Sequence, residues 1–227
     1  SWFADSDNNL MKLRNTADNA YINLFSLAGA PAFPLDGTIN SINIGKGANS
    51  VSGNTVLGES ALDASVSGAN NTAIGKEALT SNTSGHSNAA IGYQALYTNT
   101  TGHDNSALGR AALYFNTTGA NNVAVGHDAL VSNTTGGSNV AIGDTALDAN
   151  TTASNNTAVG AAALGANTTG TQNVAIGSSA LDANTTANNN IAVGHNSLSS
   201  NTIGTKNNAL GVGALTANTT ADNNTAI

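Results

Sequence analysis

The sequence predicts an all-β chain, a parallel β-roll or β-helix solenoid of seventeen-residue coils that follows a small β module. Glycine recurs at intervals of seventeen residues from Gly58 to Gly211. From Gly75 onward each of these glycines ends an N-x-A-[ILV]-G segment, which has the composition of a short strand bounded by turn residues. One leucine follows four residues after each glycine. A strict period of this length is typical of stacked repeats, not of a globular domain with one irregular core.

Residues 1–36 differ from the rest and predict an N-terminal β-hairpin module that serves for attachment. They contain the only tryptophan and both prolines of the chain. We expect strands at residues 1–4 and 10–14, joined by a turn at residues 5–9, and a third strand at residues 20–25.

Residues 37–57 predict a transition or capping coil, because the step from Gly45 to Gly58 is thirteen residues instead of seventeen. Residues 58–227 form the shaft of regular repeats, and we expect this shaft to continue beyond the sequence. Within each repeat the A-L-x-x-N stretch is either a second short strand or a single helical turn.

The large apolar residues of each repeat predict the core. An aliphatic residue before the glycine and the leucine after it are the only large apolar groups that recur in each unit. We expect both to stack inside the solenoid, coil upon coil. The residues predicted for this core are Ile74, Leu79, Ile91, Leu96, Leu113, Val125, Leu130 and Ile142.

Two asparagines recur in each repeat, and stacked asparagines predict amide ladders along the solenoid axis. One precedes the glycine by four residues, and the other follows it by seven. The second kind begins Asn-Thr-Thr and Asn-Thr-Ser triplets, which match the acceptor pattern for N-glycosylation. We interpret these triplets as architecture. The predicted ladder consists of Asn82, Asn99, Asn116, Asn133, Asn150, Asn167, Asn184, Asn201 and Asn218.

Composition limits the partners. Only 8% of residues are charged, against about 25% in ordinary soluble domains. The net charge of −7 and the absence of a basic patch argue against nucleic-acid binding, and the apolar runs are too short for membrane insertion. Two large apolar residues per coil give one chain little core of its own, so we expect a homotrimer.

Two resemblances add to this reading. The pattern W-F-x-D-S-D-N-N-L-x-K-L-R-N-x-A-D-N-A-Y-I-N-L at residues 2–24 is similar to a module common in tail-fibre and other appendage proteins of tailed bacteriophages. The N-x-A-[ILV]-G unit resembles the head repeats of trimeric autotransporter adhesins and of phage fibres. The resemblance implies a left-handed parallel β-roll in a tight trimer, in a virion fibre bound to other virion proteins through its N-terminal module.

Candidate contact residues are few. Tyr93, Tyr97, Tyr114 and Phe115 are expected on the surface, where they could contact a host glycan or protein. The four histidines and Asp144, Asp148, Asp182 and Asp222 raise the alternatives of metal or calcium binding, but isolated surface residues are the preferred interpretation. We expect no metal and no cofactor.

The leading hypothesis is a structural fibre or spike segment of a phage virion, extracellular, which projects a host-binding tip. A bacterial trimeric surface adhesin is the alternative, and an ice-binding β-solenoid is the third reading because threonine pairs recur. An enzyme is not expected: no catalytic set recurs, and Glu59 and Glu77 are the only glutamates, which disfavours a glycan depolymerase.

Overall fold

The computed structural model describes residues 2–5, 10–14, 21–26, 37–39, 42–64 and 66–227. The chain divides into two compact units, Ser1–Gly37 and Thr38–Ile227. Both are built from β-strands, and the one helical element is the short 3-10 turn η1 (Ala48–Ser50) within the described residues.

The first unit is a three-stranded antiparallel sheet of β1 (Trp2–Asp5), β2 (Leu10–Arg14) and β3 (Tyr21–Ser26). Trp2 lies opposite Leu13, and Leu10 lies opposite Ser26. The three strands expected in this module are therefore confirmed. Most of the expected turn at residues 5–9 lies outside the described residues.

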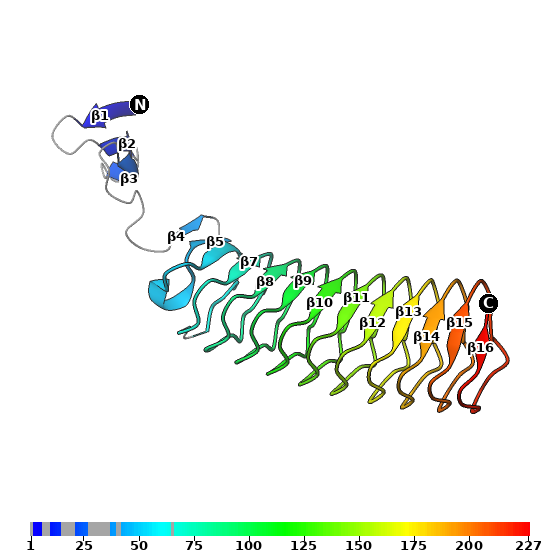
Figure 1. Ribbon diagram of the computed structural model, residues 1–227. Helices are drawn as coiled ribbons and strands as arrows, with labels where there is room; N and C mark the ends of the chain where they lie inside the picture. Colours follow the sequence, from blue (N-terminus) through cyan, green and yellow to red (C-terminus); the bar gives the residue numbers. More distant parts are fainter. Residues whose placement is uncertain (1, 6–9, 15–20, 27–36, 40–41, 65) are drawn as a thin grey trace. The chain divides into compact units, whose positions relative to one another are not determined.

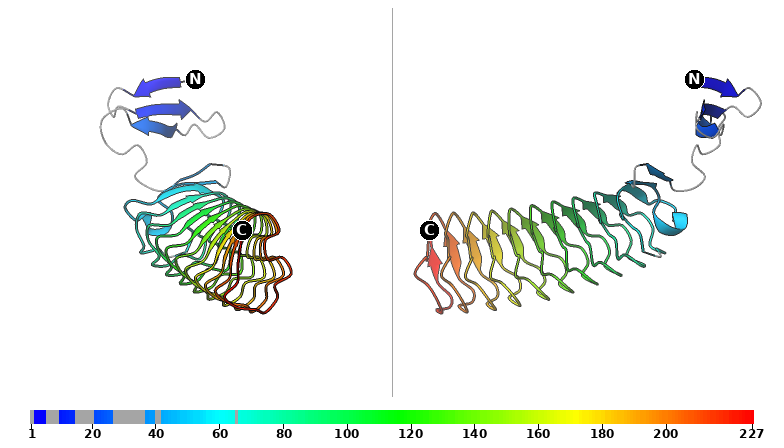
Figure 2. Two further views of the ribbon diagram at one scale, coloured as in Figure 1. Left: turned by 45° about the vertical axis from the view of Figure 1, so that its right-hand side comes forward. Right: turned by 180° about the vertical axis from the view of Figure 1, so that it is seen from behind.

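The second unit contains one long sheet in which each strand pairs with the strand of the next coil (Figure 1). From β6 onward the pairing is parallel, and partners are seventeen residues apart: Val123 lies opposite Val140, and Ala124 lies opposite Ala141. Two further views show the stacked coils in projection (Figure 2). The strands of this sheet are β4 (Gly37–Ile39), β5 (Ile42–Gly45), β6 (Thr55–Gly58), β7 (Thr72–Ile74), β8 (Ala89–Ile91), β9 (Ser106–Leu108), β10 (Val123–Val125), β11 (Val140–Ile142), β12 (Thr157–Val159), β13 (Val174–Ile176), β14 (Ile191–Val193), β15 (Asn208–Leu210) and β16 (Thr225–Ala226). The parallel β-solenoid predicted from the period is confirmed.

The start of the sheet differs from the expected shortened coil. β5 runs antiparallel to β6, with Ile44 opposite Leu57 and Gly45 opposite Val56. The thirteen residues between Gly45 and Gly58 therefore reverse the chain, and they do so through η1 and two positive-φ glycines, Gly47 and Gly53. The N-I-G motif at residues 43–45 matches the end of the repeat motif, but the same short strand sequence suits either parallel or antiparallel pairing.

The core contains fewer large side chains than predicted. The leucine is fully buried in the repeats from Leu62 to Leu198, as expected for Leu79, Leu96, Leu113 and Leu130. The prediction that Ile74, Ile91, Val125 and Ile142 belong to the core is wrong: Ile91 and Ile142 are each 39% exposed, and the other two are half-buried. Side chains alternate along a strand, so a central alanine that points inward places both of its neighbours outside.

The interior is therefore made of small groups. Ala90, Ala107 and Ala124, the middle residues of β8, β9 and β10, are at most 2% exposed. They pack in one cluster with the buried leucines and with a second buried alanine that precedes most of these leucines. A thin coil with this little apolar volume leaves room for buried amides, which fill the rest of the interior.

The glycine that ends each strand is required by its surroundings. Gly109 has φ of 140°, and a Cβ atom there would meet the carbonyl of Gly126 in the next coil. The glycine about ten residues later is different, because its φ lies outside the positive range and alanine stands there at Ala153, Ala187 and Ala221.

The A-L-x-x-N stretch is neither a strand nor a helical turn. In one coil Ala111 and Leu113 have φ of 53° and 55°, in the left-handed region that L-residues rarely adopt. Leu113 donates its N–H to Ala129 of the next coil, and Asn116 donates back to Leu113 within the turn. The left-handed conformation costs about 1–2 kcal/mol per residue, and burial of the leucine, worth about 1.5–3 kcal/mol, offsets it.

Candidate functional site

The predicted asparagine ladder is present and lies inside the solenoid. Asn116 donates from Nδ2 to Oδ1 of Asn99 at 2.8 Å, and Asn133 donates likewise to Asn116 at 2.8 Å. The same contact links the series from Asn82 to Asn218 without a break. Its members from Asn82 to Asn201 are fully buried.

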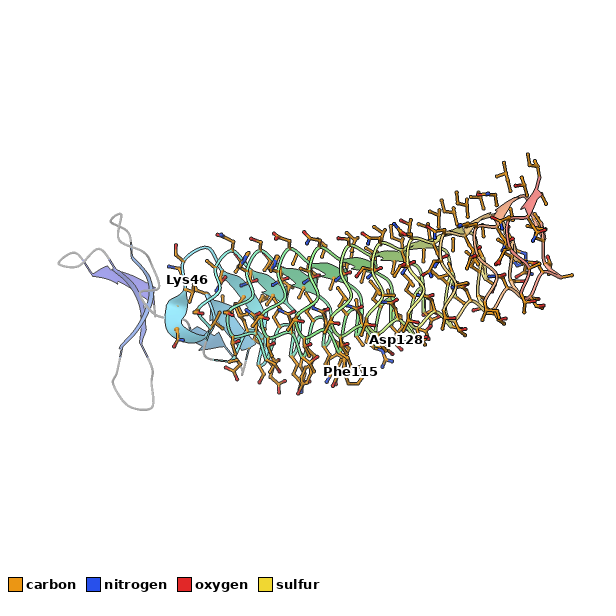
Figure 3. All side chains as sticks on the ribbon, turned by 60° about the horizontal axis from the view of Figure 1, so that its bottom comes forward. Lys46, Phe115 and Asp128 are labelled. Atoms are coloured by element: carbon orange, nitrogen blue, oxygen red, sulfur yellow. The ribbon has the colours of Figure 1, made fainter. Side chains whose placement is uncertain are left out.

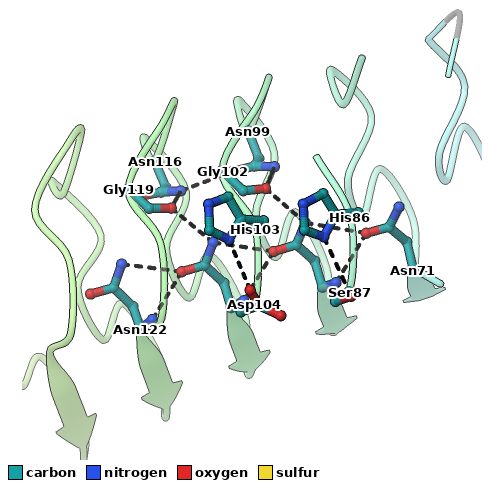
Figure 4. A network of polar contacts seen from close by, with 12 residues as sticks. Asn71, His86, Ser87, Asn99, Gly102, His103, Asp104, Asn116, Gly119 and Asn122 are labelled. Carbon is teal, nitrogen blue, oxygen red and sulfur yellow. Dashed lines mark hydrogen bonds and ion pairs between the residues drawn. The ribbon is translucent and has the colours of Figure 1, made fainter. Parts of the chain in front are cut away.

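A second ladder is formed by the asparagine that precedes each strand. Asn105 donates from its backbone N–H and from Nδ2 to Oδ1 of Asn88, both at 3.1 Å. The two ladders meet at one carbonyl per coil: Gly102 O accepts from Asn99 at 3.0 Å and from Asn88 at 2.9 Å (Figure 4). Among the described residues, no buried side-chain nitrogen or oxygen lacks a partner.

This network explains the Asn-Thr-Thr triplets. From Asn82 to Asn201 the asparagine is fully buried and hydrogen-bonded, and the first threonine is also engaged: Thr117 donates from Oγ1 to the carbonyl of Thr134 in the next coil at 3.0 Å. The triplets therefore support the architecture of each coil, and these buried asparagine side chains are not presented for modification.

The outer face of the long sheet is apolar. The last residue of each strand from β7 to β15 is a large aliphatic one, whereas the first residue is small or polar in several strands, such as Thr72, Ser106 and Asn208. The most exposed aliphatic side chains of the face are 39–51% accessible. No charged residue stands at these positions from β7 to β16. Towards β16 the face holds an open groove of about 240 Å³ that Ile191, Val193 and Leu210 help to line. The exposed members of this face are Leu57, Ile91, Leu108, Ile142, Ile176, Ile191 and Leu210.

Three of the four predicted contact residues, Tyr97, Tyr114 and Phe115, contact one another on two consecutive coils, and Tyr93 lies in the first of these coils. We call the four residues the aromatic cluster. The rings of Tyr97 and Tyr114 stack with centroids 4.9 Å apart and planes 7° from parallel. Phe115 meets Tyr114 edge to face, with centroids 4.6 Å apart. Phe115 is 50% exposed and Tyr93 is 44% exposed. Burial, followed by the nearby Tyr97, Tyr93 and Glu77, raises the pKa of Tyr114.

A ridge of polar and charged side chains accompanies this cluster. Glu77 accepts a hydrogen bond from Gln94 at 2.7 Å, and Arg110 lies 3.7 Å from Asp128. Figure 3 labels Phe115 and Asp128 among the side chains of the solenoid. These pairs join neighbouring coils on the outside, where ion pairs add little stability but set the polarity of the surface.

The histidines occupy paired positions, as the sequence indicated. His86 and His103 stack with centroids 4.9 Å apart, and His103 contacts Asp104 at 2.8 Å. His127 lies 2.8 Å from Asp144. Within the described part of the chain, no three histidine, aspartate or glutamate side chains gather as they would around a metal ion.

The aspartates considered for calcium are dispersed. Asp148 and Asp182 are two coils apart on either side of Gly165, and burial raises the pKa of each. Asp222 instead accepts hydrogen bonds from the backbone and hydroxyl of Thr205, which lower the pKa of its carboxyl group.

Fold and surface together define a parallel β-solenoid with one apolar sheet face and a local aromatic cluster. Comparisons of the chain with models of protein families, with curated proteins and with solved structures gave no match. The helices of the described residues include none with the length and apolar character needed to cross a bilayer.

Proposed function

We propose that this chain is a segment of a homotrimeric fibre or spike of a phage virion, which holds a host-binding tip away from the particle. The observation that carries the proposal is the row of exposed aliphatic side chains on the outer face of the long sheet. The resemblance of residues 2–24 to fibre and appendage modules supports the viral setting, and that module is then the attachment to other virion proteins.

The composition of the face supports self-association. Eleven strands from β6 to β16 at about 4.8 Å spacing and about 10 Å width give a strip of roughly 480 Å². The largest apolar patch on a monomeric protein is typically about 300–600 Å² and is often functional, so the uncharged, aliphatic character of the strip supports assembly and its area does not. In a trimer, three such strips face one threefold axis and each contacts both neighbours, so Ile142 and its equivalents lose their contact with water.

The role of such a shaft is mechanical. The stacked rings of Tyr97 and Tyr114 are 4.9 Å apart, so one coil of seventeen residues advances the structure by one strand spacing. Successive coils are joined by backbone hydrogen bonds and by both amide ladders, which resist bending. Reach then depends on the number of coils, and no step of chemistry is required.

Light scattering tests the assembly. The proposal expects a particle of about 67 kDa, three times the 22.3 kDa chain. Ile142→Lys would place charges against each other at the axis and should yield monomers. Thr135→Lys adds the same charge to an exposed corner of the same repeat region and should leave the trimer intact. A wild-type monomer at micromolar concentration would contradict the assembly.

Electron microscopy of virions tests the setting. Antibody raised against this chain should label a tail fibre or another appendage on particles of the phage whose genome encodes the chain. Labelling of a bacterial envelope, with no labelled virion, would favour the surface-adhesin alternative and reject the viral proposal.

The ice-binding alternative receives no support from a specific contact. The hydroxyls of Thr100 and Thr117 are engaged by carbonyls of the next coil. The outer face of the long sheet presents a row of aliphatic side chains in place of a regular threonine array. An assay for thermal hysteresis gives a direct answer, and we expect none.

A further inference from the structure

The aromatic side chains interrupt an otherwise uniform surface. All four tyrosine and phenylalanine residues between 37 and 227 occur within residues 93–115. At the same positions in other coils stand small or polar residues, such as Ser178, Thr80, Thr216 and Ala149. The repeat folds with those smaller groups, so packing of the coil does not require the rings.

The rings are placed together and remain accessible. Tyr97 and Tyr114 stack across one coil step, and Phe115 adds a ring at 76° to that of Tyr114. Tyr93 and Phe115 each keep about half of their surface in contact with water. The cluster therefore offers an apolar surface with ring faces and ring edges in two orientations, on a rigid scaffold.

Hydrogen-bonding side chains lie in the same two or three coils. Gln94 lies in the same coil as Tyr97, three residues before it. Its hydrogen-bond partner Glu77 lies one coil earlier. Asp128 follows one coil later and lies 3.7 Å from Arg110. Carboxylate, amide and guanidinium groups thus lie in the coils that hold the rings or in the coils next to them.

We propose that this cluster binds a glycan, with the C–H face of a pyranose ring against Phe115 and the tyrosines and its hydroxyls bound to Gln94, Glu77 or Asp128. The C–H groups of a sugar carry partial positive charge, which suits the negative face of an aromatic ring. Sugar hydroxyls both donate and accept, so a mixed rim of amide and carboxylate groups serves them.

Other occupants suit the cluster less well. Nucleic acid requires a basic track for its phosphates, whereas this chain has a net charge of −7 and the rim contains Glu77 and Asp128. A stable protein interface covers about 800 Å² on each partner, far more than two or three coils of this surface provide. A few sugar units fit an area of this extent, and they would bind along the shaft independently of its tip.

The rings can be removed without disturbing the repeat, because other coils supply the replacements. Tyr93→Ser, Tyr97→Thr, Tyr114→Thr and Phe115→Ala each introduce a residue that already stands at the equivalent position elsewhere. A combined variant with all four changes should keep the circular dichroism spectrum and the number of chains per particle of the wild-type protein. Val131→Thr, at the position of Tyr114 in the next coil, is the matched control.

Saturation-transfer difference NMR with cellohexaose, maltohexaose and chitohexaose tests the proposal. Saturation of the aromatic protons should reach the ring protons of at least one hexaose in the wild-type protein and in Val131→Thr. The four-residue variant should bind that hexaose at least tenfold more weakly. No transfer to any hexaose at millimolar concentration, or equal transfer in the variant, would reject the glycan site.

The assembly state separates this inference from the proposed fibre. If the four-residue variant loses the trimer while the control keeps it, the rings are an interface between copies and the glycan site is rejected. If the wild-type chain is a monomer yet binds a hexaose through the rings, the trimeric fibre fails and the glycan site remains.

Discussion

Asn116 donates from its side-chain amide to the side-chain oxygen of Asn99 at 2.8 Å, seventeen residues away, in a fully buried position. The same amide also donates to the carbonyl of Gly119 at 3.0 Å. One polar side chain thus closes its own turn and joins two coils, which explains how a solenoid with one leucine per coil holds together.

Replacement of this residue should be costly. In Asn116→Ala, Oδ1 of Asn99 and one N–H of Asn133 lose their partners inside the coil. Each unsatisfied buried group costs about 1–3 kcal/mol, so we expect the free energy of unfolding to fall by about 2–5 kcal/mol. Urea unfolding measures the change. Thr118→Ala, at an exposed corner nearby, should have little effect, and equal losses would contradict the ladder as a source of stability.

Two glycines of one repeat should respond differently to alanine. Gly126 has φ of 136°, and a Cβ atom there would meet the carbonyl of Gly143. Gly126→Ala should therefore cost at least about 2 kcal/mol. Gly136→Ala should cost much less, although an ideal Cβ atom would also be crowded there, because Ala153 occupies the equivalent position and the backbone accommodates it. Melting temperatures that rank the two variants in the opposite order would contradict this account.

The left-handed turn predicts an unusual response to glycine. Ala162 has φ of 54°, whereas Ala166 has no positive φ. Glycine removes the left-handed strain at residue 162, which offsets its entropic cost of about 0.5–1 kcal/mol, but it brings only that cost at residue 166. Ala162→Gly should be more stable than Ala166→Gly by about 1 kcal/mol in chemical unfolding. Equal stabilities would show that the turn stores no strain.

Asp148 should make stability depend on pH. Its carboxyl pKa is raised above the ordinary 3.8, mainly by burial, so the folded state favours the protonated form. Protonation of this carboxyl group therefore contributes to the free energy of unfolding. The contribution is fully present below pH 3.8 and is lost as the pH rises through the folded-state pKa. Asp148→Asn should therefore stabilise the fold at pH 7, by less than about 1 kcal/mol because the group is partly exposed, and should have no such effect at pH 3.

Asp63→Asn provides the control for that measurement. Asp63 occupies the equivalent position in an earlier repeat and is exposed. A gain at pH 7 as large as that of Asp148→Asn would mean that net charge, not burial, governs the effect.

The period predicted the stacking direction and the ladder, because a contact repeated seventeen residues away leaves a trace at each position. Leu113 and Asn116 were identified correctly for this reason. The side to which Ile91 and Ile142 point could not be predicted from hydrophobicity alone, since a three-residue strand is apolar on both faces. The alanine before each of them, Ala90 or Ala141, fills the space inside the coil, and only the backbone geometry reveals that the larger groups do not fit there.

The left-handed leucines were missed for a related reason. Leucine carries no signal for positive φ, and its conformation is imposed by the narrow coil. The chain reversal before β6 was missed because Asn43, Ile44 and Gly45 match the strand motif without specifying its direction. For the candidate contact residues, the sequence placed Tyr97 and Tyr114 one coil apart, but the edge-to-face contact of Phe115 depends on the shape of the corner.

The shared carbonyl that joins both amide ladders also bears on how such a gene changes. Gly102 and its equivalents accept the same two amides in successive repeats, so removing seventeen consecutive codons restores every contact across the junction. Recombination between near-identical repeats would therefore yield folded shafts of different length, whereas a loss of sixteen or eighteen residues would misalign both ladders. Selection then acts on whole coils, and the length of the shaft becomes a heritable quantity that varies in discrete steps.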